Sequence, residues 1–116
     1  MSGKPARDDV SGNDPIGDLG GYTDASVHIM VALSDGPRHG YAIMAEVERE
    51  TGRPMRPGTL YAALSRLERR GLVEAMPAED RRHPYRLTTM GTQALAAVLD
   101  RMEALAARGR ERLERG

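Results

Sequence analysis

The chain has 116 residues, with 17 lysines and arginines balancing 17 aspartates and glutamates, and it contains no Cys, Trp or Phe. This length suits one small domain whose core is built from aliphatic residues, Met and Tyr. The lack of cysteine excludes a disulfide framework, a thiolate zinc site and a cysteine nucleophile. Its apolar runs are too short to span a membrane and its N-terminus has no apolar signal core, so we expect a soluble, cytoplasmic protein without membrane contact.

The neutral total hides an uneven distribution of charge. Residues 1–22 carry four aspartates against Lys4 and Arg7, and residues 23–52 are also acidic overall. Residues 53–86, in contrast, hold eight arginines against four acidic residues. Arginine binds phosphate oxygens and guanine edges in a bidentate manner, whereas lysine acts as a point charge. A GC-rich genome also produces arginine-rich chains, so this bias alone does not establish a nucleic-acid partner.

The N-terminal part divides into a tail and a first helix. Residues 1–22 have no hydrophobic period, which predicts a mobile tail. Thr23 or Asp24 is suited to cap a helix that ends at Asp35-Gly36-Pro37. The helical spacing of its inward face places together Val27, Met30, Val31 and Ser34.

Two more helices are predicted before residue 72. The first runs from about His39 to Thr51 and is closed by Gly52, with an inward face formed by Tyr41, Ile43, Met44 and Val47. The next begins at Pro57, where the missing N–H costs nothing, and continues to Gly71. Its apolar stripe follows the spacing i, i+3, i+4 and i+7 at Leu60, Ala63, Leu64 and Leu67.

The remainder predicts a hairpin and a long helix. Leu72 to Met76 and Tyr85 to Thr88 read as two strands around a charged loop at 77–84. From Thr89 the apolar residues recur at alternating intervals of four and three, which is a heptad pattern. A small core cannot cover this whole stripe, so we expect a homodimer. Its dimerisation residues are predicted to be Leu95, Leu99, Met102, Leu105, Ala106 and Leu113.

The order of these elements predicts a mainly α fold with a small β-hairpin, that is, a winged helix-turn-helix followed by a C-terminal dimerisation helix. The expected organisation is a tail at 1–22, a DNA-binding domain at 23–88 and a dimerisation helix at 89–116. The third helix would present small residues to base edges and cationic or hydroxyl side chains to phosphates. The candidate contacts on this helix are Gly58, Thr59, Ala62, Ser65, Arg66 and Arg69, and those of the wing are Arg81, Arg82 and His83.

Several short motifs resemble the PadR family of bacterial transcriptional regulators. They are the segments His39-Gly40-Tyr41-Ala42-Ile43, 57–64 (PGTLYAAL), 66–68 (RLE) and 71–73 (GLV), followed by 85–88 (YRLT), Gly91 and Ala94-Leu95. The resemblance covers about residues 25 to 100, with the motifs in the expected order and spacing. Ala62 stands where the family usually has Pro, and the wing lacks the Gly-Arg turn often found there.

The resemblance implies a dimeric repressor that binds double-stranded DNA at a pseudo-palindromic operator. It adds Pro57, Tyr41 and Tyr61 to the DNA-binding residues, with both tyrosines against phosphates, and it includes a small-molecule effector among the partners to be considered. The C-terminal part is a single helix, as in the short branch of the family. It has no Trp of the kind that some short members use to stack flat aromatic ligands between subunits.

The alternatives to DNA binding are a metal site, catalysis and the binding of another protein. His28, His39 and His83 have no metal-ligand spacing, and no nucleophile beside a base, carboxylate pair or phosphate-cradling loop is visible, so neither a metal, a cofactor nor catalysis is expected. The alternative is a winged-helix module that binds another protein with the same face. A steep fall of DNA affinity with salt would distinguish the two functions.

Overall fold

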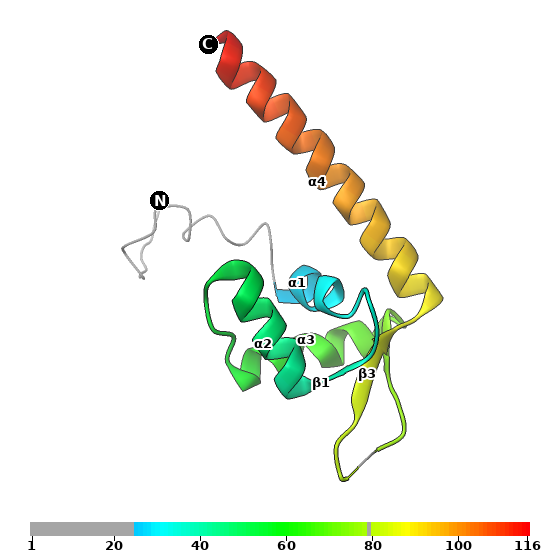
Figure 1. The fold of residues 1–116 in the computed structure, drawn as a ribbon. Coiled ribbons are helices and arrows are strands. Elements are labelled where there is room, and N and C mark those ends of the chain that lie inside the picture. Colours follow the sequence, from blue (N-terminus) through cyan, green and yellow to red (C-terminus); the bar gives the residue numbers. More distant parts are fainter. Residues whose placement is uncertain (1–24, 79) are drawn as a thin grey trace, which may run out of the picture.

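A computed structural model of the chain describes residues 25–78 and 80–116. Four helices and three short strands follow one another in these residues (Figure 1). Their bounds are α1 Ala25–Ala32, β1 Arg38–His39, α2 Gly40–Thr51, α3 Pro57–Arg69, β2 Val73–Ala75, β3 Pro84–Leu87 and α4 Thr89–Arg115. The expected tail and the caps at Thr23 or Asp24 lie outside the described residues.

The three N-terminal helices enclose one aliphatic core. α1 packs against both α2 and α3, and these two also contact each other. Every large side chain in the core is aliphatic or Met, as the composition requires. The buried residues are Ile29, Met30, Ala32, Leu33, Ile43, Val47, Leu60, Ala63, Leu64, Leu67, Val73 and Leu95.

The helix limits follow from local sequence signals. Pro57 is the first residue of α3, and Gly52 is the left-handed residue that ends α2. All four residues of the predicted α3 stripe are buried. In α1, however, Ser34 lies beyond the helix and is exposed, so its predicted inward position was wrong. Its hydroxyl instead donates to the Val31 carbonyl, a local bond by which serine competes with helical pairing.

The sheet has one strand more than the predicted hairpin. β3 is the central strand, antiparallel to β2 on one side and to β1 on the other. β1 consists of Arg38 and His39, which pair with Tyr85 and Pro84. Because two residues carry no recognisable period, sequence patterning could not reveal this strand.

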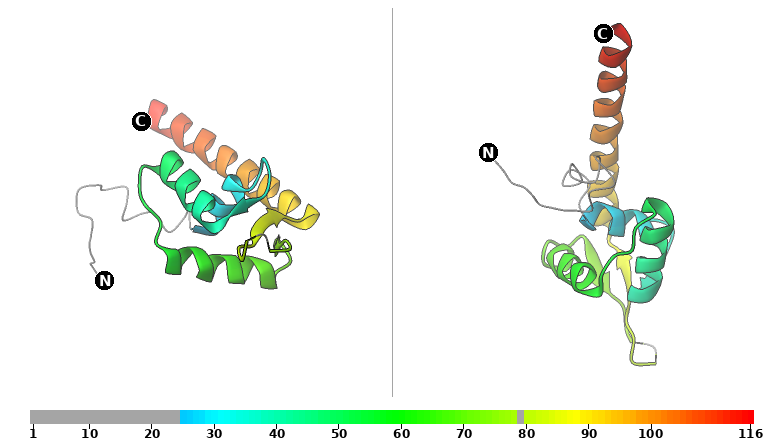
Figure 2. Two further views of the ribbon diagram at one scale, coloured as in Figure 1. Left: turned by 60° about the horizontal axis from the view of Figure 1, so that its bottom comes forward. Right: turned by 90° about the vertical axis from the view of Figure 1, so that its left-hand side faces the viewer.

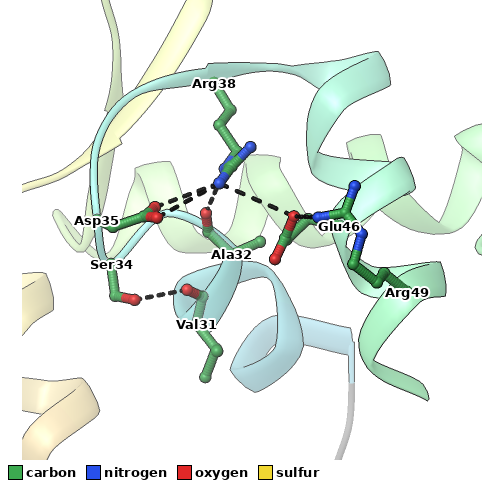
Figure 3. Close-up of polar contacts among 7 residues, drawn as sticks. All are labelled: Val31, Ala32, Ser34, Asp35, Arg38, Glu46 and Arg49. Carbon is green, nitrogen blue, oxygen red and sulfur yellow. Dashed lines mark hydrogen bonds and ion pairs between the residues drawn. The ribbon is translucent and has the colours of Figure 1, made fainter.

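Arg38 fixes the corner between α1 and β1 (Figure 3). Its Nε donates to the Ala32 carbonyl oxygen at 2.8 Å, which satisfies an acceptor left over at the C-terminus of α1. Its Nη2 lies 3.3 Å from Asp35 and 3.8 Å from Glu46 of α2, and Glu46 also pairs with Arg49. One guanidinium therefore connects α1, β1 and α2.

The start of α4 is locked onto the sheet by Thr88. Its hydroxyl accepts from the Gly91 N–H at 2.9 Å and donates to the Gly71 carbonyl at 2.6 Å, and its own N–H donates to the Leu72 carbonyl. Gly91 is buried in this junction, and a β-carbon there would overlap the Leu72 carbonyl oxygen. Only glycine allows the helix to approach β2 this closely.

We call the β2–β3 hairpin the wing, and α1, α2 and α3 the helical body. α4 and the wing project in opposite directions from the helical body (Figures 1 and 2). α4 contacts the body through its first turns, where Gly91 and Leu95 are buried, and residues 103–116 are all exposed. No helix in the described part of the chain is long and apolar enough to cross a membrane.

We predict that Gly91→Ala lowers the free energy of unfolding by about 1–3 kcal/mol, because the added methyl group meets backbone and not a movable side chain. Urea denaturation measures this change. Gly58→Ala is the matched control, since nothing lies within 4 Å of a β-carbon there, and it should leave stability unchanged or raise it by up to ~1 kcal/mol. Equal effects of the two substitutions would contradict the close contact between Gly91 and the Leu72 carbonyl.

Candidate nucleic-acid interface

The face of α3 that points away from the core is small and polar at its centre. The buried stripe of α3 occupies one side of the helix, so residues about half a turn away face solvent. These are Gly58, Ala62, Ser65 and Arg69, and all four are exposed. The short side chains leave the backbone of α3 open to close approach, as a helix that reads base edges requires.

The two margins of this face differ. On one side, Arg66 reaches back to α1, with its Nη2 3.5 Å from the Ser26 hydroxyl. On the other, Tyr61 and Glu68 lie near Tyr85 of the wing: burial raises the pKa of the Tyr85 hydroxyl, and the Glu68 carboxylate and Tyr61 raise it further. Tyr85 is therefore a neutral phenol at physiological pH.

A groove of about 430 Å³ lies between α2, α3 and the wing. It brings together six residues that the sequence predicted to bind DNA: Tyr41, Pro57, Tyr61, Arg81, Arg82 and His83. It also contains His39, Gly40, Met44 and Tyr85, whose place there depends on the β1–β3 pairing that the sequence did not reveal. Thr59, Ser65, Arg66 and Arg69 lie on the exposed face of α3 outside the groove lining.

Tyr41 occupies a different position from the one predicted by helical periodicity. The stripe of α2 placed it inward, but its side chain is 74% exposed at the edge of the groove. The inward face of α2 is formed by Gly40, Ile43 and Val47 instead. An exposed aromatic ring with a hydroxyl suits contact with a sugar–phosphate backbone better than a core position.

Several arginines at the ends of α3 and in the wing have no acidic partner. In the part of the chain that the structure describes, Arg56, Arg69, Arg81 and Arg82 make no ion pair. Arg86, in contrast, is neutralised across the sheet by Glu74. Unpaired guanidinium groups gathered on one face create a positive potential that attracts a polyanion.

The wing turn is held in a strained conformation. Asp80 and Arg81 have φ values of +50° and +68°, in the left-handed region where side chains other than Gly and Asn are disfavoured. Asp tolerates this region better than Arg does. Close by, His83 Nδ1 lies 3.1 Å from the Met76 carbonyl oxygen and joins the two sides of the hairpin.

The predicted dimerisation residues divide into two groups. Leu95 is only 5% exposed and belongs to the core of the single chain, so its side chain is not available to a partner. Met102 is half-buried and Ala106 is exposed. Leu99 is more than a third exposed, and exposure rises to 59% at Leu105 and 81% at Leu113.

Metal-ligating residues do not gather in any part of 25–78 or 80–116, where no three His, Asp or Glu side chains are placed to share an ion. Among the described residues, the groove is lined by tyrosine, histidine and arginine side chains together with Gly40, Met44 and Pro57, and none of these lining residues is acidic. Its chemistry is that of an anion-binding surface.

Comparison with known proteins agrees with this chemistry. Residues 29–97 match the model of the transcriptional regulator PadR-like family. Over 85 residues the chain is 41% identical to an uncharacterised 37.1 kDa protein of transposon TN4556 from Streptomyces fradiae. The match covers 73% of this chain but 25% of that protein, so the chain spans about a quarter of this curated relative.

Solved structures share the fold. A transcriptional regulator from Clostridium thermocellum is 24% identical with a TM-score of 0.68, covering 82% of this chain and 93% of that one. A PadR family transcription regulator from Clostridium difficile is 25% identical with a TM-score of 0.67, covering 76% and 96%. RosR from H. salinarum is 31% identical with a TM-score of 0.59, covering 85% and 90%.

The family model and the solved structures are those of transcriptional regulators. Both the winged-helix architecture and the motifs noted in the sequence lie within the matched region. Because the family model covers more than half of the chain, the protein belongs to the PadR-like family of transcriptional regulators.

Proposed function

We propose that the protein is a sequence-specific DNA-binding regulator that places α3 in the major groove and its wing on the neighbouring backbone. The observation that carries this proposal is the groove between α2, α3 and the wing, whose described lining contains unpaired arginines and no acidic residue. Such a surface binds the phosphate backbone, and the adjoining small face of α3 is suited to base edges.

We further propose that the protein acts as a homodimer. α4 exposes Leu99 and Leu113 of its heptad stripe and Leu105 beside that stripe. Two such helices would bury the stripe against each other. In this scheme residues 23–88 form the DNA-binding unit, 89–116 the dimerisation helix and 1–22 a separate tail.

A dimer with two-fold symmetry would recognise a pseudo-palindromic operator and repress by covering the promoter. Footprinting on the region upstream of its own coding sequence, with and without small-molecule effectors, tests this function. Protection of two symmetric half-sites is expected. If the surface binds another protein instead, no footprint forms and duplex affinity shows no steep dependence on salt, whereas DNA binding gives a log–log slope near −0.9 per phosphate contact.

Arg69→Ala is expected to weaken operator binding about ten-fold or more, because Arg69 lies at the centre of the exposed face of α3 and has no acidic partner in the described residues. Fluorescence anisotropy at several salt concentrations measures the loss. Arg108→Ala removes the same charge from an exposed position on α4 and should leave the affinity unchanged. Equal losses for both variants would indicate an effect of net charge alone.

Arg81→Gly should have opposite effects on folding and on binding. Glycine adopts the left-handed conformation of the turn without strain, so stability should stay the same or rise by up to ~1 kcal/mol despite the usual cost of glycine. DNA affinity should fall, because the guanidinium is lost. Thermal unfolding measures the change in stability, and fluorescence anisotropy on the same preparation measures the change in DNA affinity. A variant that binds DNA as well as the parent would show that Arg81 is not part of the interface.

Leu105→Asp is expected to convert the dimer into monomers, because a carboxylate buried in a helix–helix seam costs several kcal/mol. Analytical ultracentrifugation gives the mass directly. Ala104→Asp adds the same charge to the neighbouring exposed position, on the outer side of the heptad, and should remain dimeric. A parent protein that sediments as a monomer would contradict the proposed assembly.

A further inference from the structure

Gly40 lies at the joint where β1 ends and α2 begins, and it is buried. A β-carbon at this position would overlap the hydroxyl oxygen of Tyr61, and it would also lie 3.1 Å from Tyr61 Cζ and 3.3 Å from Leu60 Cδ2. The phenol of Tyr61 therefore rests directly on the backbone of Gly40. Tyr61 comes from α3, so this contact joins the two helices of the helix-turn-helix.

The contact forms part of the wall of the groove. Gly40, Tyr61 and Tyr85 all line it, and Tyr61 is close enough to Tyr85 to raise the pKa of its hydroxyl. The start of α2 is held in place because His39, immediately before Gly40, pairs with Pro84 of β3. Tyr61 thus lies between Gly40 of α2 on one side and Tyr85 of the wing on the other.

We propose that Gly40 is a positioning residue for DNA binding: its missing side chain seats the Tyr61 phenol and thereby sets the opening of the groove that receives a backbone phosphodiester. This inference rests on the proposed function. Gly40 acts through Tyr61 and does not itself touch the DNA. The phosphodiester is the ligand because cationic and hydroxyl groups converge on the groove, and no carboxylate is among the described residues that line it.

A side chain at position 40 displaces Tyr61 more readily than it disturbs the core. The overlapping atom is the far end of an exposed side chain, which can rotate outward, whereas the Leu60 contact is merely tight. Alanine is also a better helix former than glycine at the start of α2. The predicted result is a folded protein with a groove of altered shape.

A double-mutant cycle tests the proposal with a labelled random-sequence duplex at low salt, because a phosphodiester contact is independent of sequence. Gly40→Ala should weaken binding about ten-fold in the parent protein and less than two-fold in a Tyr61→Ala background, where no ring remains to be displaced. Arg82→Ala provides the matched background: Arg82 lines the same groove from the wing and is not among the three nearest contacts of a β-carbon at position 40, so the about ten-fold loss should persist there.

Each outcome decides the question. Additive losses in the Tyr61→Ala background, or no loss in the parent, would overturn the positioning role. If Gly40→Ala unfolds the protein, the same cycle is read by thermal unfolding, and Tyr61→Ala must then restore the folded state for the contact to be responsible. A parent protein that binds no duplex at any salt concentration would contradict the proposed function, while the stability cycle would still report on the contact between Gly40 and Tyr61.

Discussion

The two-residue pairing between β1 and β3 determines how the functional surface is built. It joins Arg38 to Tyr85 and His39 to Pro84, and it is the step at which the helical body becomes attached to the wing. Arg38 is held from its other side by the Ala32 carbonyl and the carboxylates of Asp35 and Glu46 (Figure 3). This pairing adds a second attachment of the helical body to the hairpin, besides the direct contact between α3 and β2.

The same joint explains why the groove is shaped by a glycine. β1 runs directly into α2 with no intervening residue, so the first helical residue lies beside the wing strand and under α3. A side chain there would occupy the space that Tyr61 fills. Gly91 has the corresponding role at the other junction, where α4 leaves the sheet against the Leu72 carbonyl. At both junctions, the start of α2 and the start of α4, a glycine thus permits a close contact that a larger residue would prevent.

Local signals in the sequence were sufficient for the helices and the hairpin, because caps and periodicity act within a few residues. Pro57 and Gly52 predicted helix limits that the structure confirms. Features that depend on contacts distant in sequence were missed. Periodicity placed Tyr41 in the core, whereas the family resemblance placed it at the DNA, and its ring is exposed. The heptad pattern placed Leu95 against a partner, although its own chain buries it. Gly40 belongs to one of the sequence motifs, but its contact with Tyr61 on α3 depends on the folded arrangement of the two helices.

For the proposed function, the placement of charge matters more than the neutral net charge of the chain. Non-specific affinity grows with the number of phosphates that a protein neutralises, whatever the sequence. Here the unpaired arginines are gathered on the α3 and wing face, while exposed acidic residues such as Glu48 and Glu50 lie on α2. In the proposed complex α3 faces the groove of the DNA, so the unpaired arginines and the small polar face of this helix meet the duplex in the same orientation. Charge placement then favours contacts that carry sequence information.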